Sequence, residues 1–167
     1  MFKHLYQRER KSKVPTLIVT QENIKKRVSE LARQINKECG KKGIEELFVI
    51  CVMKGAIMFT CDLIKNITVP LTLYFLNKGE KFPDVSGKNV LVIEDILDSG
   101  KTISFLKKEL EIFLPNSLTF VVLLDKEKKV KFRPKLIGFK VGLRQFYWGY
   151  GLDKEEKYRN LPYIISE

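Results

Sequence analysis

Three carboxylates gather around one glycine turn in the stretch VLVIEDILDSGKT, residues 90–102. Glu94 and Asp95 follow a run of apolar residues, and Asp98 lies in the turn itself. The stretch ends like a phosphate-binding P-loop, but that motif requires a glycine where this chain has Asp95. The carboxylates therefore need a chemical explanation other than a P-loop.

The second half of the turn suits a phosphate group. Gly100 lets the backbone fold closely, and Ser99 and Thr102 offer hydroxyl groups. The amides that open the next helix add about half a positive charge at its N-terminus. A monophosphate can therefore be bound there directly.

The acids cannot bind that phosphate themselves, because like charges repel. Glu94 and Asp95 suit the hydroxyls of a ribose diol or a divalent cation that keeps several waters, and Asp98 is placed to take a proton from a substrate. Taken singly, each acid could equally cap a helix or solvate the end of a strand. Together, beside a Gly-Lys-Thr turn, they favour a site for a phosphorylated ribose and a metal ion.

Hydrophobic patterning predicts the elements that position this turn. A long helix begins after Thr20 and ends at GKKG, residues 40–43. Strands that alternate with helices predict an α/β fold with a parallel sheet, and ligands gather at the carboxyl ends of such strands, where the turn at 53–56 also falls. The further helices are expected at 57–64 and 103–113, and the strands at 47–52, 69–76, 90–95, 118–125, 136–141 and 145–151.

Length and charge limit the number of domains and the kinds of binding partner that we expect. The 167 residues suit one domain, expected at 14–167, after a basic arm at 1–13. The net charge of +11 is compatible with nucleic acid, an acidic membrane surface or phosphorylated small molecules, and equally with a solvated lysine-rich surface. No apolar run approaches the roughly 20 residues of a membrane span, so we expect no membrane partner.

The cysteines indicate a reducing compartment. There are three, they lie in apolar stretches, and none has C-x-x-C spacing. We therefore expect no disulfide framework, no zinc site and a cytoplasmic location.

The stretch 90–102 resembles the phosphoribosyl-diphosphate signature of the type I phosphoribosyltransferases, in which two acids follow a hydrophobic strand and D-[ST]-G-x-T comes next. Residues 17–35, 51–64 and 146–164 resemble, in the same order, segments of hypoxanthine-guanine phosphoribosyltransferases. The resemblance covers nearly the whole chain except the first dozen residues and 77–86. It implies the type I phosphoribosyltransferase fold, a mainly parallel twisted sheet flanked by helices, with a small hood region.

The activity that this resemblance implies is purine salvage. The phosphoribosyl group of 5-phosphoribosyl diphosphate passes to hypoxanthine or guanine, giving IMP or GMP and pyrophosphate, with Mg²⁺ as cofactor; xanthine stays open as a third base. A homodimer or homotetramer is also implied. The alternative is a catalytically weak relative that acts as a nucleotide-responsive RNA-binding regulator. The basic charge favours it and the complete catalytic set disfavours it, so we do not expect a nucleic-acid partner.

The resemblance also implies roles within the turn. Asp98 matches the catalytic base at the purine N7 proton. Glu94 and Asp95 match the acids that meet the ribose hydroxyls and magnesium. The cradle of the 5-phosphate corresponds to Ser99, Gly100, Lys101 and Thr102.

The pyrophosphate and the purine have further counterparts. Lys54 and Gly55 match the loop that receives pyrophosphate, in which the family often holds the bond before the lysine in a cis form, and Arg159 matches a guanidinium on the same group. Lys126 matches the lysine that donates to the purine O6, which selects oxopurines over adenine because an ammonium can only donate. The remaining counterparts are Phe146, which stacks on the base, Tyr147, which meets the purine through its backbone, and Asp153, which lies near the purine and meets magnesium through water.

Two departures from the family pattern stand out. Trp148 replaces a small aliphatic residue, and strand alternation predicts that it shares a face with Phe146. The segment 77–86 is too short for the mobile Ser-Tyr loop that closes over the reacting centre in the family. Lys78, Lys81 and Phe82, or a partner subunit, are the candidates to replace that loop, and we expect an active but slow enzyme.

Overall fold

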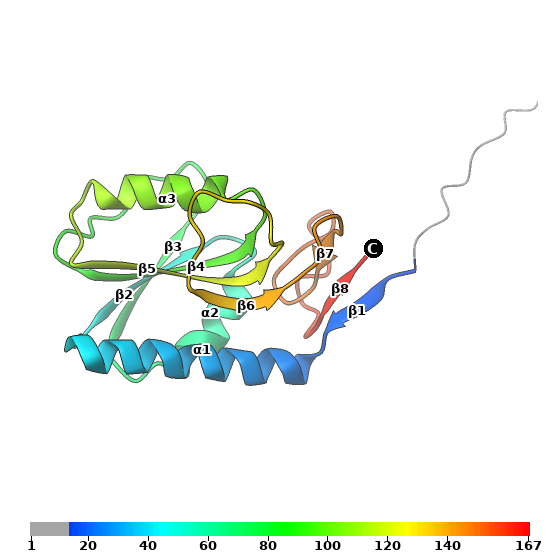
Figure 1. The fold of residues 1–167 in the computed structure, drawn as a ribbon, viewed down its shortest axis with the longest axis horizontal. Coiled ribbons are helices and arrows are strands. Elements are labelled where there is room, and N and C mark those ends of the chain that lie inside the picture. Colours follow the sequence, from blue (N-terminus) through cyan, green and yellow to red (C-terminus); the bar gives the residue numbers. More distant parts are fainter. Residues whose placement is uncertain (1–13) are drawn as a thin grey trace, which may run out of the picture.

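The computed structural model describes residues 14–167, so the predicted basic arm at 1–13 lies outside the described residues (Figure 1). The helices are α1 (Gln21–Lys42), α2 (Ile57–Ile64) and α3 (Lys101–Glu111). The strands are β1 (Thr16–Val19), β2 (Leu47–Val52), β3 (Leu71–Leu76), β4 (Asn89–Leu97), β5 (Ser117–Asp125), β6 (Leu136–Lys140), β7 (Tyr147–Trp148) and β8 (Ile164–Ser166).

The main sheet has five strands in the order β3-β2-β4-β5-β6, and every neighbouring pair is parallel. Helices α1 and α2 cover one face and α3 the other, as Figure 1 shows. The strands β1, β8 and β7 form a separate antiparallel sheet beside it, which we call the hood. The predicted α/β fold, with a parallel sheet flanked by helices and a small hood, is confirmed.

Local chemistry explains the first helix. The Thr20 side chain accepts a hydrogen bond of 3.2 Å from the Asn23 amide and so caps the helix, and Gly43 ends it in the left-handed conformation at φ 62°. One face is buried against the sheet and α2. The buried positions recur at the spacing of one helical face: Ile24, Val28, Leu31, Ala32, Ile35 and Cys39.

Each central strand contains an uninterrupted apolar run, 47–52 in β2, 90–93 in β4 and 120–124 in β5, because both faces of these strands are covered. In β2, Val49 faces the α1 side and Ile50 the α3 side, and both are fully buried. The sheet therefore separates two cores, and the acidic residues of β4 and β5, Glu94, Asp95 and Asp125, lie toward the carboxyl ends of their strands.

The observed boundaries differ from the predicted ones at several elements; helix α3, for example, spans Lys101–Glu111 rather than 103–113. Strand β4 continues to Leu97, so Glu94 and Asp95 lie within the strand rather than after it. The expected strand at 145–151 shortens to Tyr147–Trp148, because the next three residues have positive φ angles and turn the chain away. The short strands β1 and β8 had no counterpart in the prediction.

Candidate active site

A cleft of about 700 Å³ opens at the carboxyl ends of β2, β3 and β4. It brings together residues that are up to about 100 positions apart in the sequence. The predicted site residues that line it are Lys54, Gly55, Glu94, Asp95, Lys101, Thr102, Asp153 and Arg159.

The acid pair at the end of β4 is poised for a ligand. Glu94 is 5% exposed, and its Oε2 is buried without a hydrogen-bond partner among the described residues. Burial raises the pKa of Glu94, and the Asp95 charge raises it further. Asp95 accepts a hydrogen bond of 2.6 Å from the Ile96 amide. A buried carboxylate oxygen without a partner requires a proton, a hydroxyl donor or a cation.

These two carboxylates fit a magnesium ion that takes its other ligands from water and substrate oxygens. No group of three or more candidate metal ligands occurs among residues 14–167, so a site enclosed by protein ligands alone is not built there. The donor set therefore suits a cation that arrives with an anionic substrate.

The turn between β2 and α2 approaches Asp95 closely. The peptide bond between Met53 and Lys54 is cis, as the resemblance implied. A Cβ atom placed on Gly55 would lie 1.6 Å from Asp95 Oδ2. Glycine at this position is therefore required by contact with a predicted ligand of ribose and magnesium.

Acidic partners hold two of the cationic side chains that line the cleft, those of Lys54 and Arg159. Lys54 Nζ lies 3.0 Å from Glu156 Oε2. The guanidinium of Arg159 reaches Asp153 at 2.8 Å and Glu156 at 3.2 Å, and it also donates to the Gly151 carbonyl at 2.9 Å. An anionic ligand can therefore exchange with Glu156, which is an exposed residue on a loop.

Asp98 lies between two lysines. Lys126 Nζ donates to its Oδ2 at 3.2 Å, and Lys128 donates to its Oδ1. The Lys128 hydrogen bond is the main cause of the lowered pKa of Asp98, and Lys126 adds to it. Asp98 is therefore ionised at neutral pH, as a general base must be.

The turn after Asp98 presents its polar groups to solvent. Gly100 has φ 72°, and a Cβ atom there would also meet Val130 Cγ1 at 2.9 Å, so both the backbone and the space require glycine. Ser99, Lys101 and Thr102 are exposed around the N-terminus of α3. This arrangement leaves the first amides of the helix accessible to an anion.

Aromatic side chains from β7 and the residue before it complete the region. The Phe146 ring is half exposed and lies 6.3 Å from the buried Trp148 ring, which confirms that the two share a face. The Tyr147 hydroxyl is turned inward, with Gly142 O at 3.0 Å and Gln145 Oε1 at 2.8 Å. Lys126 Nζ lies 5.8 Å from the centre of the Tyr147 ring, so it spans the space between Asp98 and β7.

Sequence reasoning missed several residues of this region. Lys128 and Glu156 contact predicted site residues, and the only signals were their positions in charged runs beside Lys126 and Asp153. Asp125 is fully buried and accepts hydrogen bonds from the Glu127 amide and from Arg133. That ion pair anchors the segment that carries both lysines.

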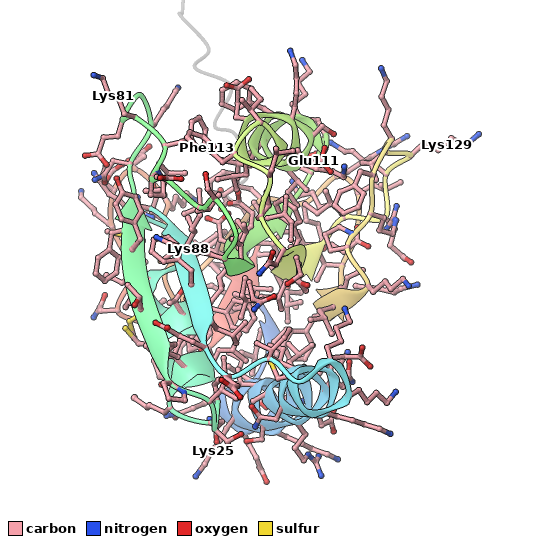
Figure 2. The ribbon with its side chains drawn as sticks, turned by 90° about the vertical axis from the view of Figure 1, so that its left-hand side faces the viewer. Lys25, Lys81, Lys88, Glu111, Phe113 and Lys129 are labelled. Carbon is pink, nitrogen blue, oxygen red and sulfur yellow. The ribbon has the colours of Figure 1, made fainter. Side chains whose placement is uncertain are left out.

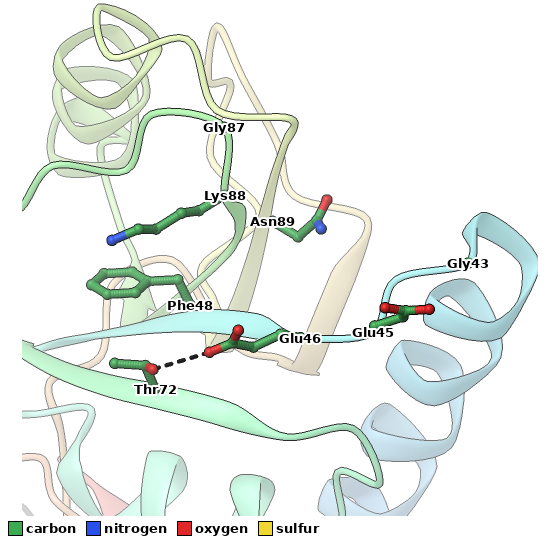
Figure 3. A pocket seen from close by; sticks show the side chains of 8 residues that line it. All are labelled: Gly43, Glu45, Glu46, Phe48, Thr72, Gly87, Lys88 and Asn89. Carbon is green, nitrogen blue, oxygen red and sulfur yellow. Dashed lines mark hydrogen bonds between the residues drawn. The ribbon is translucent and has the colours of Figure 1, made fainter.

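A second hollow, of about 460 Å³, lies at the opposite, amino end of β2 and β4 (Figure 3). Lys88 Nζ lies 4.4 Å from the centre of the Phe48 ring, and Thr72 donates to Glu46 at 3.3 Å. None of the predicted site residues lines it. The carboxyl end of the sheet is therefore the candidate active site.

Residues 16–155 match the phosphoribosyl transferase domain, and the chain belongs to that family. It is therefore an enzyme of the pentosyltransferase class. It is similar to hypoxanthine-guanine phosphoribosyltransferases and hypoxanthine phosphoribosyltransferases over most of its length. The hypoxanthine-guanine phosphoribosyltransferase of Dictyostelium discoideum is 38% identical over 169 residues, which cover 89% of this chain and 92% of that protein. The hypoxanthine phosphoribosyltransferase of Haemophilus influenzae is 30% identical over 166 residues, with the same coverage.

Solved structures of the same enzymes are similar to this chain in fold as well as in sequence. A crystal structure of a hypoxanthine-guanine phosphoribosyltransferase from Bacillus anthracis has a TM-score of 0.83 at 36% identity and covers 91% of this chain and 98% of that one. The hypoxanthine phosphoribosyltransferase of Trypanosoma cruzi, solved in complex with the product IMP, has a TM-score of 0.83 at 31% identity, with 89% and 88% covered. The expected family and fold are confirmed.

Proposed function

We propose that this protein transfers the phosphoribosyl group of 5-phosphoribosyl diphosphate to hypoxanthine or guanine in purine salvage. The observation that carries the proposal is the pair formed by Lys126 and Asp98, 3.2 Å apart. A 6-oxopurine presents a carbonyl acceptor at O6 beside the N7–H donor. An ammonium next to a carboxylate is complementary to that edge, whereas the amino group of adenine would face the ammonium donor.

In this mechanism the purine N9 lone pair forms the bond to C1 of the ribose as the bond to pyrophosphate breaks. Asp98 accepts the N7 proton, and Lys126 moves from Asp98 to donate to O6. The half-exposed ring of Phe146 stacks on the base, while Tyr147 contributes its backbone and Asp153 lies near the purine. Lys128 lowers the pKa of Asp98 below its ordinary value, so Asp98 meets the base as a carboxylate.

The phosphate half of the site binds the donor substrate. Lys54 and Gly55 receive the pyrophosphate together with Arg159, whose planar fork suits its oxygens. Glu94 and Asp95 meet the ribose hydroxyls and would hold Mg²⁺, with Asp153 reaching it through water. The ion would neutralise charge on the diphosphate as it leaves. The 5-phosphate lies on the turn of Ser99, Gly100, Lys101 and Thr102.

The protein as a whole acts, on this proposal, as one catalytic domain at 14–167. Exposed apolar side chains at the β3 edge and on α2, Phe75 and Met58, support assembly as a homodimer or homotetramer. The three free cysteines support a cytoplasmic location. Among residues 14–167 no helix is long and apolar enough to cross a membrane.

The alternative of an RNA-binding regulator gains no support. The relatives described above are named as enzymes. Lys25, Lys81 and Lys129 extend from different sides of the molecule in Figure 2, so these lysines do not form one basic surface.

The test is nucleotide formation from 5-phosphoribosyl diphosphate and Mg²⁺ with hypoxanthine, guanine, xanthine and adenine offered separately. We expect product from hypoxanthine and guanine and not from adenine. Asp98→Asn should lower kcat by about 10²–10⁴-fold, because general-base catalysis contributes that much. Glu109→Gln, on the outer helix α3, is the control. Product from adenine at the rate for hypoxanthine would contradict the role of Lys126, and no product from any base would contradict the proposed function.

A further inference from the structure

The connection between β3 and β4 is a short, hydrogen-bonded segment rather than a long loop. Its first four residues form a turn in which the Asn77 amide groups donate to the Glu80 carboxylate at 3.1 and 2.9 Å, and the Glu80 amide donates to the Asn77 carbonyl at 3.2 Å. Gly79 has φ 86°, the conformation that a type II turn requires at its third position. Lys78 therefore occupies the second position of a closed turn.

The rest of the segment is held against the domain. The Phe82 ring lies 5.9 Å from the Phe105 ring of α3, and Val85 is fully buried in the core on that side of the sheet. The Tyr74 hydroxyl also reaches the Lys81 carbonyl at 3.5 Å. Residues 77–81 are exposed, but these contacts tie residues 77–85, which we call the wall, to one side of the cleft.

Lys78 stands on this wall as a cation without a counter-ion. It lines the cleft together with Lys54 and Arg159. Those two cations are paired with Glu156 and Asp153, whereas no ion pair within the described residues includes Lys78. The carboxylate nearest to it in sequence, Glu80, is already bound by Asn77.

We propose that Lys78 binds the diphosphate of 5-phosphoribosyl diphosphate from this wall, in the cleft that Lys54 and Arg159 also line. The inference rests on the proposed function, because it takes the diphosphate as the ligand of the cleft. The second lysine of the wall does not share the role: Lys81 does not line the cleft, and it lies at the outer end of the segment in Figure 2. Charge from this lysine thus replaces the closure that the short segment cannot make.

The experiment measures binding of inorganic pyrophosphate with Mg²⁺ by calorimetry, and the KM values for 5-phosphoribosyl diphosphate and hypoxanthine. Lys78→Ala should weaken pyrophosphate binding about tenfold, which is typical for one hydrogen bond to a charged group, and raise the KM of the diphosphate substrate similarly. The KM for hypoxanthine and the melting temperature should not change. Lys78→Arg should keep most of the affinity, and Lys81→Ala, which removes the same charge outside the cleft, should keep all of it.

Unchanged pyrophosphate affinity in Lys78→Ala would overturn the inference, and so would an equal loss in Lys81→Ala. The two proposals fail separately. If the unsubstituted protein binds pyrophosphate through Lys78 and yet makes no nucleotide, the inference stands and the proposed function falls. If the unsubstituted protein makes nucleotide and Lys78→Ala makes it equally well, the proposed function stands and the inference falls. Absence of pyrophosphate binding to the unsubstituted protein also overturns the inference.

Discussion

Replacing Gly55 by alanine should separate the stability of this fold from its activity. The added Cβ would lie 1.6 Å from Asp95 Oδ2 and 2.6 Å from its Cγ, so the carboxylate has to retreat by about 1.8 Å to reach an ordinary contact of 3.4 Å. The two nearest atoms belong to the carboxylate, which can rotate away, and the Asp95 Cβ at 3.1 Å has to give by only a few tenths of an ångström. The fold therefore loses little more than the hydrogen bond from the Ile96 amide to Asp95, about 1 kcal/mol.

Activity should suffer far more than stability. If Asp95 meets the ribose and magnesium, a displacement of more than 1 Å moves a binding group out of its productive position, which costs about 100-fold. We expect kcat/KM for 5-phosphoribosyl diphosphate to fall by that factor at saturating hypoxanthine. The melting temperature should change by a few degrees at most.

Gly40→Ala is the matched control. Gly40 lies in the last turn of α1, and a Cβ there meets nothing within 4 Å. Alanine should therefore stabilise the helix by roughly 0.5–1 kcal/mol and leave the kinetics unchanged. If Gly55→Ala retained kcat/KM within threefold of the unsubstituted protein, the assignment of Asp95 to the substrate would be refuted.

Two further substitutions test the surroundings of the catalytic base. Arg133→Met should lower the free energy of unfolding by about 2–3 kcal/mol in urea titrations, because it leaves the fully buried Asp125 without its cation. The loss falls below that of a fully buried ion pair because Arg133 is itself partly exposed. An unchanged urea midpoint would contradict this role of Arg133. Lys128→Met should raise the pKa of Asp98 in a carboxyl NMR titration, with Lys129→Met as control. Because the pKa of Asp98 is lowered in the folded protein, ionised Asp98 stabilises the fold at pH values above its ordinary pKa, and this stabilisation is lost as the pH falls through the folded pKa. In Lys128→Met the loss should occur at higher pH. Equal titration of Asp98 in both variants would remove Lys128 as the cause of the lowered pKa.

The main sheet was predictable because each of its elements carries its own signal. Helix α1 shows a capping threonine, a 3.6-residue period and a terminal glycine. The runs at 47–52 and 120–124 are apolar throughout because both faces of those strands are buried. The hood strands have no such signal. Strands β1 and β8 have four and three residues, too few to display a period, and their stability comes from pairing across the chain.

In the predicted site, too, residues with a local sequence signal were found, and residues brought in by irregular segments were missed. Residues 94–102 belong to one strand, turn and helix, so their proximity follows from local sequence, and Lys54 joins them because parallel strands end at a common edge. The contacts of Lys128 with Asp98 and of Glu156 with Lys54 depend on how two irregular segments fold back. No periodic pattern encodes those paths, and so sequence reasoning did not find them.

The hood sets the order in which the two halves of the site can form. The phosphate turn is made by consecutive residues, whereas the strand that holds Tyr147 pairs with Ser166, and Ser166 pairs in turn with Thr16. Loop closure over so long a separation is slow compared with local folding. During synthesis on the ribosome, β1 emerges early and has no partner until residues 164–166 have been made. A nascent chain should therefore form the phosphate turn at 98–102 before the hood closes and positions Phe146 and Tyr147 on the purine side of the site.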